Sequence, residues 1–309
     1  MLSFAFIAIS ASIATRLPTI SAESLQRELW ATPGRDLFKT DIHAILHCGN
    51  GAPRFRLMYL PVRNRGEVPR LIMEEAKCAY EIEVVGFSQW EQYIKAGTPF
   101  GKCPVLRDFD GGGTDLANEL AITRWLAQRC GLAGRSVAEQ ALVDSVHEQL
   151  WCTLRNQGVS HDGEHYSALA LRECEDAAAT LEATPRYQEI FRREAKSLPR
   201  AVRSLAALRV FEERLASSQS GWLVGEGLTY VDIALFEILD QLSEPDQVPD
   251  FAERFELPQL GAFLERMEKR PQLREYLASD RRMPRYGRDA STGEGVYVYI
   301  EGKGAPARS

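Results

Sequence analysis

The sequence predicts an α/β domain followed by an all-helical domain. Between residues 54 and 134 the signals run strand, helix, strand, loop, strand, strand and helix, over a length that suits a small domain. From residue 136 to about residue 279 the apolar residues recur at helical spacing, and no segment shows the alternation of a strand. We therefore expect an open sheet in residues 54–134 and helices in residues 135–285.

Strand and helix signals follow each other closely in the first domain. The stretch RFRLMYLP alternates like a strand, with Leu57 and Tyr59 on one face, and Pro61 ends it. A helix follows at once, because Glu67 and Pro69 are typical of a first helical turn. The later stretches predict a strand (YEIEVVGF), a loop (WEQYIKAGTPFGK), two short strands joined by a Gly-rich hairpin (CPVLRDFDGGGTDLA) and a helix (NELAITRWLAQRCGL).

The helical domain contains one clear start signal. In LTYVDIALFEIL, Thr229 is the expected N-cap and Asp232 the carboxylate that reaches back to it, so we expect a structural role for Asp232. Pro199 is expected to kink or divide a helix. The polar segment 158–185 is either an inserted loop or a short extra helix. His147 is expected at the surface or at an interface.

Both ends of the chain read as additions to these two domains. Residues 1–53 contain no strong periodic element and are expected to form an extension, and the Gly-rich residues 286–309 are expected to form a flexible tail. The apolar start MLSFAFIAISASIA is too short to span a bilayer. Residues 1–22 are either a targeting peptide or an unstructured leader, because the basic residue expected before an apolar targeting core is missing.

Composition excludes several classes of function. The formal net charge of −6 argues against a general affinity for nucleic acid or acidic lipid. The six cysteines are scattered without a C-x-x-C pair, which predicts neither a disulfide framework nor a zinc site and favours a reducing compartment. His161 and His165 in HDGEH have a composition that suits a metal, but Gly163 and polar surroundings favour an exposed loop. We expect no metal.

The turn after the first strand is the first candidate site. Tyr59 ends the strand, Arg63 and Arg65 lie in the turn, and a helix begins directly afterwards. A helix N-terminus concentrates free backbone donors and positive potential, to which the two arginines add. A tyrosine hydroxyl at this place is suited to donate a hydrogen bond to an anion, although a tyrosine at a strand end more often serves in packing.

The Cys103-Pro104 pair is the second candidate. A proline at the start of a short strand cannot donate to the sheet, and a cis bond would turn the backbone of Cys103 outward to pair with a peptide-like ligand. The Cys103 thiol is either a nucleophile or a packed side chain. The packed reading is favoured, because no basic partner is evident in the sequence.

These residues resemble the tyrosine-type cytosolic glutathione transferases, most closely the pi and sigma classes. The resemblance runs from Tyr59 and PVRNR through FGKCPVL, LANELAITRWLAQRCGL, LVGEGLTYVDIALFEIL and RPQLREYLASDRRMP, in the order and approximate spacing of that family. It implies a thioredoxin-like domain that binds glutathione, followed by a helical domain that shapes the site for the second substrate. It also implies a homodimer in the cytoplasm, with glutathione as co-substrate.

Residue by residue, the resemblance implies that Tyr59 stabilises the glutathione thiolate and that Cys103 pairs through its backbone with the cysteinyl part. Arg65 matches a glutathione-site arginine, and Asn118 and Glu119 fall where the γ-glutamyl end is held. The full glutathione site that it implies consists of Tyr59, Arg65, Trp90, Lys95, Lys102, Cys103, Pro104, Asn118 and Glu119, with Trp90 and Lys95 at the glycine carboxylate.

Three residues depart from the pattern of that family. Glu119 brings a carboxylate where a serine is usual, Cys152 stands where an acidic residue usually reaches across the dimer interface, and Asn64 replaces a glycine. Asn tolerates unusual backbone dihedrals, so the last change is the mildest. The first two favour an alternative, a non-catalytic ligand-binding or scaffold protein of the same fold.

The expected activity is transfer of glutathione to hydrophobic electrophiles. A glutathione-dependent isomerase or peroxidase at the same site, and thiol exchange through Cys103, stay open. The sequence does not identify the electrophile. No nucleic acid and no stable membrane span is expected among the partners.

Overall fold

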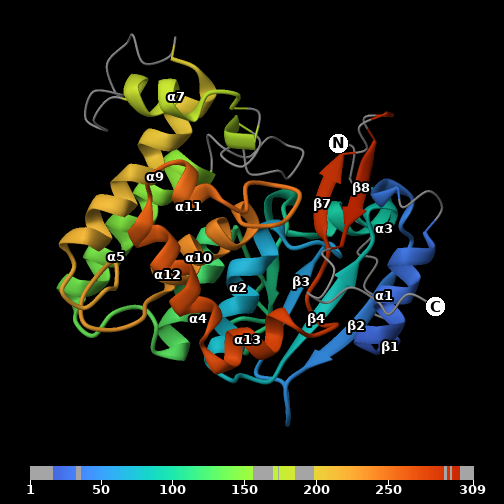
Figure 1. Ribbon diagram of the computed structural model, residues 1–309. Helices are drawn as coiled ribbons and strands as arrows, with labels where there is room; N and C mark the ends of the chain where they lie inside the picture. The colour runs from blue at the N-terminus through green and yellow to red at the C-terminus, as the bar shows by residue number, and fades with distance from the viewer. Residues whose placement is uncertain are drawn as a thin grey trace, which may run out of the picture.

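The computed structural model describes residues 17–32, 36–155, 170–172, 174–184, 198–288, 291–292 and 294–299. The structure contains one six-stranded sheet, in the order β1-β2-β4-β3-β5-β6. The helical half of the chain lies to one side of this sheet (Figure 1). The strands are β1 (Thr19–Ile20), β2 (His43–Cys48), β3 (Phe55–Tyr59), β4 (Tyr80–Val85), β5 (Val105–Arg107) and β6 (Leu116–Ala117). This mixed sheet followed by helices confirms the predicted fold class.

The centre of the sheet is a strand–helix–strand unit, as the pattern of apolar residues predicted. Strand β3 pairs in parallel with β4, from Phe55 opposite Tyr80 to Tyr59 opposite Val84. Helix α2 (Asn64–Glu75) connects them. On the other side β3 pairs antiparallel with β5, and the Gly-rich turn joins β5 to β6 as a hairpin, as expected. Helix α4 (Glu119–Cys130) then packs beside α2 and ends at Gly131, whose φ of 73° is left-handed.

The loop expected after β4 is in fact a series of short helical turns. They are α3 (Phe87–Gln89), η3 (Trp90–Ile94), η4 (Lys95–Gly97) and η5 (Pro99–Gly101). Trp90 is buried there, and its cluster contains Met58, Val85, Val105 and Ala117 of the sheet. The apolar pattern of the sequence did not predict these turns, because Trp90 is the one residue within them that is buried.

The described part of residues 1–53 forms regular elements, although the sequence shows no strong periodic element there; that these residues form an extension stays a prediction. Strand β2 pairs antiparallel with β4 over six residues, from His43 opposite Val85 to Cys48 opposite Tyr80, and β1 pairs in parallel with β2. Before β2 lie helix α1 (Ala22–Ala31) and the turn η2 (Leu37–Lys39). A targeting peptide that reached residue 22 would include β1. Residues 1–16 lie outside the described residues.

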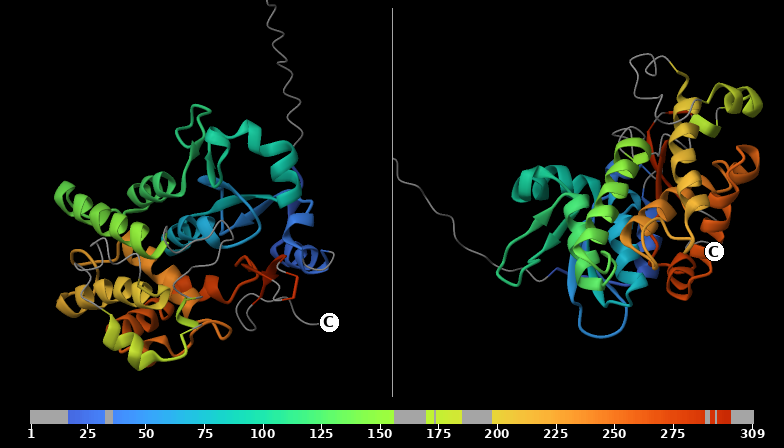
Figure 2. Two further views of the ribbon diagram at one scale, coloured as in Figure 1. Left: turned by 90° about the horizontal axis from the view of Figure 1, so that it is seen from above. Right: turned by 90° about the vertical axis from the view of Figure 1, so that its left-hand side faces the viewer.

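The flexible tail predicted for residues 286–309 is also wrong in its described part. Strands β7 (Arg285–Arg288) and β8 (Gly295–Val298) pair antiparallel. They lie beside the N-terminal elements (Figure 2): Asp36 bridges to Val296, and the rings of Trp30 and Tyr299 meet edge-on at 5.0 Å. The described segments nearest to the two ends of the chain thus pack against each other. Residues 300–309 lie outside the described residues.

The second half is helical, as predicted, and the described residues between 136 and 279 contain no strand. Its helices are α5 (Val137–Leu150), η6 (Trp151–Arg155), α7 (Ala177–Ala183), α9 (Arg200–Ser217), α10 (Tyr230–Leu242), α11 (Phe251–Arg254), α12 (Pro258–Glu268) and α13 (Pro271–Leu277). Pro199 caps the start of α9 and does not kink it. Of the polar segment 158–185, the described part includes the short helix α7, whereas HDGEH lies outside the described residues.

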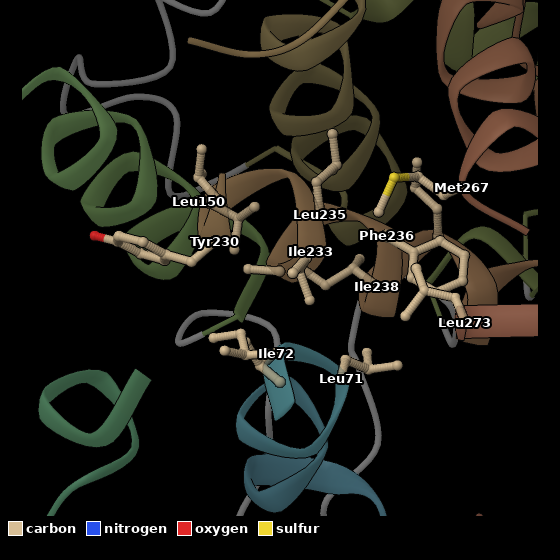
Figure 3. Close-up of a cluster of buried hydrophobic side chains, with 14 of the residues drawn as sticks. Leu71, Ile72, Leu150, Tyr230, Ile233, Leu235, Phe236, Ile238, Met267 and Leu273 are labelled. Carbon is tan, nitrogen blue, oxygen red and sulfur yellow. The ribbon is translucent and has the colours of Figure 1, made fainter. Parts of the chain in front are cut away.

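Helix α10 lies at the centre of this half and packs against α2, the helix that connects β3 and β4. Leu71 and Ile72 of α2 point toward Ile233 and Ile238 of α10 (Figure 3). The predicted capping box is present: the Asp232 carboxylate accepts hydrogen bonds from the backbone N–H of Thr229 at 2.8 Å and of Leu223 at 2.9 Å. A structural role for Asp232 follows from these bonds. The division into domains at residues 134 and 285 stays a prediction.

Candidate functional site

Tyr59 lies at the end of β3, where the chain turns directly into α2. Its side chain is 3% exposed, and its hydroxyl oxygen accepts a hydrogen bond from the backbone N–H of Arg65 at 3.2 Å. The ring rests on Gly66, where an added Cβ would lie 2.4 Å from the Tyr59 Cδ1 atom. Because that approach is far below van der Waals contact, the glycine is required for the ring to stay where it is. The abrupt change from strand to helix therefore holds a phenol against a helix N-terminus.

The two arginines of the turn have different environments. Arg63 is buried, and its guanidinium pairs with Asp240 on α10 at 3.5 Å and with Glu244, which follows the end of that helix. Arg65 is partly exposed and lies over the Trp151 ring, with 5.2 Å from its guanidinium carbon to the ring centroid. The expectation that both arginines supply positive potential to an anion is therefore wrong for Arg63, whose charge is already paired inside the protein.

Sequence reasoning missed Arg70, which holds the shape of this turn. Its guanidinium donates to the carbonyl oxygens of Val62 at 2.8 Å and of Arg63 at 3.1 Å, and to the carboxylate of Glu67 at 3.0 Å. Arg70 is fully buried. Glu67 was assigned to the helix dipole alone, although it also accepts from the Tyr276 hydroxyl at 3.2 Å. The spacing of Glu67 and Arg70, three residues apart on one helix, was the available signal.

Glu119 and Asn118 approach the same turn from the start of α4. The Glu119 carboxylate is buried and lies 3.9 Å from the Arg65 guanidinium. Asn118 precedes the helix with φ 74° and ψ 118°, a backbone conformation that residues other than glycine rarely adopt. Strained backbone of this kind clusters at functional sites, and here it stands where the sequence placed a ligand contact. Asn64 likewise has a positive φ of 35°, in agreement with the tolerance expected of asparagine.

Cys103 and Pro104 complete the surroundings of the phenol. The peptide bond between them is cis, Pro104 is buried at the start of β5, and Cys103 is half-buried. Burial raises the pKa of the Cys103 thiol to about 12, while Arg65, Lys102 and Lys95 act in the opposite direction. At neutral pH this thiol is therefore protonated, which argues against Cys103 as a nucleophile and favours the packed reading.

The electrostatics of Tyr59 make it a hydrogen-bond donor. Burial, and after it the neighbouring Cys103 and Glu119, raise the pKa of the phenol well above its usual range, whereas Arg65 lowers it. The phenol therefore keeps its proton at every physiological pH. A protonated phenol cannot serve as a general base, but it can donate to an anion placed beside it.

The remaining predicted residues lie farther along the chain, in the helical turns after β4. The Trp90 side chain is 6% exposed in the apolar cluster on the other face of the sheet, Lys95 is paired with Glu91 at 3.1 Å, and Lys102 is exposed. The positive charges of Lys102 and Lys95 act to lower the pKa of the Cys103 thiol, against the effect of burial. The roles of Trp90 and Lys95 at a glycine carboxylate stay predictions.

Of two other candidates from the sequence, the HDGEH motif lies outside the described residues, and His147 does not lie at the surface. His147 is buried, against expectation, and its ring packs against that of Tyr230 with 5.0 Å between centroids. Among the residues that the structure describes, no group of three or more His, Cys, Asp and Glu side chains could hold a metal ion. In the same residues, no helix is both long and apolar enough to span a membrane.

Comparisons with known proteins agree with this geometry. Residues 183–280 match the family described as Glutathione S-transferase, C-terminal domain. Glutathione S-transferase 1 from Ascaris suum is 28% identical over 232 residues, covering 75% of this chain and 99% of its own. Glutathione S-transferase P from Bos taurus is 28% identical over 238 residues, covering 75% and 96%. The crystal structure of the glutathione S-transferase from Ascaris lumbricoides has a TM-score of 0.52 at 27% identity, covering 73% and 97%.

The chain is therefore similar to glutathione S-transferases in sequence and in fold. The match covers nearly the whole length of these relatives. About a quarter of the chain lies outside the match with the Ascaris suum relative, which covers 75% of it. The structure accordingly contains the fold of these relatives together with segments outside the match.

Proposed function

We propose that this protein is a glutathione transferase in which the Tyr59 hydroxyl stabilises the glutathione thiolate. The observation that carries the proposal is the buried, protonated phenol, held by the Arg65 backbone N–H and surrounded by Arg65, Cys103 and Glu119. A thiol with a pKa of about 8.5 is only a few per cent ionised near neutrality. A charge-assisted hydrogen bond worth about 1.5–3 kcal/mol would lower that pKa by roughly one to two units and make the thiolate the main species.

The γ-glutamyl end of glutathione carries both an ammonium and a carboxylate, and the site offers both complementary charges. Arg65 and the buried Glu119 lie 3.9 Å apart at the start of two neighbouring helices. The carboxylate of the ligand is assigned to Arg65 and to the helix N-terminus at Asn118. Its ammonium is assigned to Glu119. In this arrangement Glu119 attracts the ammonium group of the ligand, and Arg65 offsets the repulsion between the Glu119 carboxylate and the ligand carboxylate.

The rest of the glutathione site follows the resemblance. Cys103, before the buried Pro104, pairs through its backbone with the cysteinyl part, and Trp90, Lys95 and Lys102 serve the glycine carboxylate. Hydrophobic electrophiles are the proposed second substrates, and glutathione-dependent isomerisation or peroxide reduction would use the same thiolate. No specific observation favours thiol exchange through Cys103, because burial keeps its thiol protonated.

A homodimer is part of the proposal. The resemblance supports it, and Phe100, 81% exposed, and Val137, 84% exposed, are apolar side chains that an interface between two copies could bury. Sedimentation velocity of the purified protein tests it. The cytoplasmic location implied by the resemblance also stays a prediction.

The substitution Tyr59→Phe tests the proposed function. Loss of the hydroxyl should lower the rate of conjugation to an activated aromatic halide roughly 10- to 100-fold at neutral pH, since a bond of about 1.5–3 kcal/mol is removed. The thiolate absorbance of bound glutathione should then appear only at higher pH. Tyr297→Phe is the matched control, because Tyr297 is equally buried but bonds to Thr40 at 2.6 Å, in the packed chain ends.

Two results would refute parts of this proposal. Undiminished conjugation by Tyr59→Phe would mean that another group activates the thiol. A wild-type protein that neither conjugates nor binds immobilised glutathione would favour the alternative, a non-catalytic ligand-binding or scaffold protein of the same fold.

A further inference from the structure

We propose that Cys78 and Cys130 form a reversible disulfide, so that the protein carries an oxidation site separate from the glutathione site. The two Sγ atoms lie 3.7 Å apart, although 52 positions separate the residues in the sequence. Cys78 follows the end of α2, and Cys130 is the last residue of α4. No sequence pattern predicts this pair, because only the packing of α2 beside α4 brings the two thiols together.

The distance is short enough for bond formation with local adjustment. A disulfide needs about 2.05 Å between sulfurs, so the two atoms must approach by roughly 1.7 Å. Both residues stand at the ends of elements, where side chains and backbone shift more easily than inside a helix. Lys77, before Cys78, and Gly131, after Cys130, have left-handed φ values of 52° and 73° and mark these ends.

Exposure and charge assign an order to the two thiols. Cys130 is half-buried, whereas Cys78 is buried, so an oxidant reaches Cys130 first. Arg54, an exposed residue, donates to the Cys78 sulfur at 3.5 Å. Burial, followed by the neighbouring Cys78, raises the pKa of Cys130 to about 12, and Arg54 opposes this. Oxidation should therefore be slow at neutral pH and become faster as the pH rises.

The chemistry balances with a hydroperoxide as oxidant. The Cys130 thiolate attacks the terminal oxygen of the hydroperoxide, the O–O bond breaks, and an alcohol leaves after taking up the thiol proton, which gives Cys130 sulfenic acid. The Cys78 sulfur then attacks the sulfenic sulfur, and the S–O bond breaks as the S–S bond forms. The Cys78 proton leaves with the hydroxyl as water. Two thiols are oxidised and one hydroperoxide is reduced, and a dithiol reductant reverses the change.

The position of the pair gives the disulfide a structural consequence. Helices α2 and α4 begin at the candidate site, with Arg65 and Glu119 in their first turns, and end near the two cysteines. A covalent bond there would join the far ends of the two helices that form the site. Oxidation would therefore restrict the relative motion of these helices without occupying the site itself.

Peptide mapping of the full-length protein tests the proposal. The reduced protein is treated with hydrogen peroxide or tert-butyl hydroperoxide, alkylated in denaturant and digested with trypsin. Trypsin cuts after Lys77 and Arg129, so Cys78 lies in peptide 78–95 and Cys130 in peptide 130–135, and neither peptide contains another cysteine. The expected result is a linked 78–95/130–135 species, the loss of two alkylated thiols, and the recovery of both after dithiothreitol.

Three variants sharpen the outcome. Cys130→Ser should abolish the linked species, whereas Cys152→Ser, at an exposed cysteine, should leave it unchanged. In Cys78→Ser, Cys130 should stop at the sulfenic acid, which dimedone traps. The proposal is overturned if Cys78 and Cys130 stay separately alkylated while other thiols oxidise. It is equally overturned if either peptide links to another cysteine, or if the linkage occurs only between two chains on a non-reducing gel.

Discussion

At the scale of single residues, the site depends on the Tyr59 phenol, which is buried but hydrogen-bonded. The Tyr59 hydroxyl accepts from the Arg65 N–H, which leaves its own proton available for donation. Burial keeps that proton in place. The Tyr59 ring lies against Gly66, and Arg70 fixes the turn that follows Tyr59 through its hydrogen bond to the Val62 carbonyl. Activation of an anion at this place therefore requires no titratable base, only a fixed donor.

Gly66→Ala tests how tightly the ring is held. A Cβ would lie 2.4 Å from Cδ1 and 2.9 Å from Cγ of Tyr59, so the ring or the helix must move. We expect the free energy of unfolding in urea to fall by about 1–3 kcal/mol, the usual cost of overpacking. Gly112→Ala is the control, because its nearest contact would be at an ordinary 3.4 Å. Equal stabilities for both variants and the wild type would show that the Tyr59 ring adjusts freely.

At the scale of elements, prediction from sequence succeeded where local rules decide. Strand β3, the β5–β6 hairpin and the capping box of α10 each carry their signals within a few residues. Strand β2 carries no such signal. Its His43 and His47 interrupt the apolar residues and find partners only in Glu83 and Glu81 of β4, far along the chain. Strands of this kind are specified by their neighbours in the sheet and not by their own pattern.

The row His43, Glu83 and Arg107 across β2, β4 and β5 predicts a pH dependence of stability. Burial alone would raise the pKa of Glu83, but hydrogen bonds from His43 at 3.0 Å and Arg107 at 2.9 Å outweigh it and lower the pKa to about 2. Because the folded-state pKa is lowered from 4.5, this stabilisation is present above about pH 4.5 and is lost as the pH falls toward 2.

Glu83→Gln should remove this dependence. We expect it to lower the free energy of unfolding by up to about 3 kcal/mol at pH 7, and to flatten the decline between pH 5 and pH 3. Urea unfolding at several pH values measures both effects. Glu265→Gln, in an exposed pair with Lys269 at 3.1 Å, is the control and should change little. A Glu83→Gln protein whose stability declines as steeply as the wild type would assign the acid dependence to other groups.

At the scale of the whole molecule, buried ion pairs join three distant parts of the chain. The carboxylate of Glu244, just after the end of α10, bridges Arg63, at the start of α2, and Arg285, at the start of β7, with 2.7 Å to the Arg285 Nε atom. The Arg63 backbone N–H also donates to the Pro284 carbonyl at 3.0 Å. The local sequence predicted Arg63 as an anion-binding residue, because the carboxylates that bury its charge lie about 180 positions away. Residues such as Arg65, whose partners lie in the recognised motifs, were assigned from the sequence.

Glu244→Ala tests whether this network holds the C-terminal segment against the turn of the site. Its removal would leave the buried charges of Arg63 and Arg285 without their shared carboxylate, so we expect a loss of about 3–5 kcal/mol in the free energy of unfolding. Asp246→Ala is a matched control: Asp246 pairs with the same Arg285 but is 47% exposed, and its loss should cost about 1 kcal/mol or less. Urea unfolding of both variants measures the difference. Equal costs would mean that solvent reaches Glu244 as readily as Asp246, and that the chain end is not fixed to the turn by buried charge.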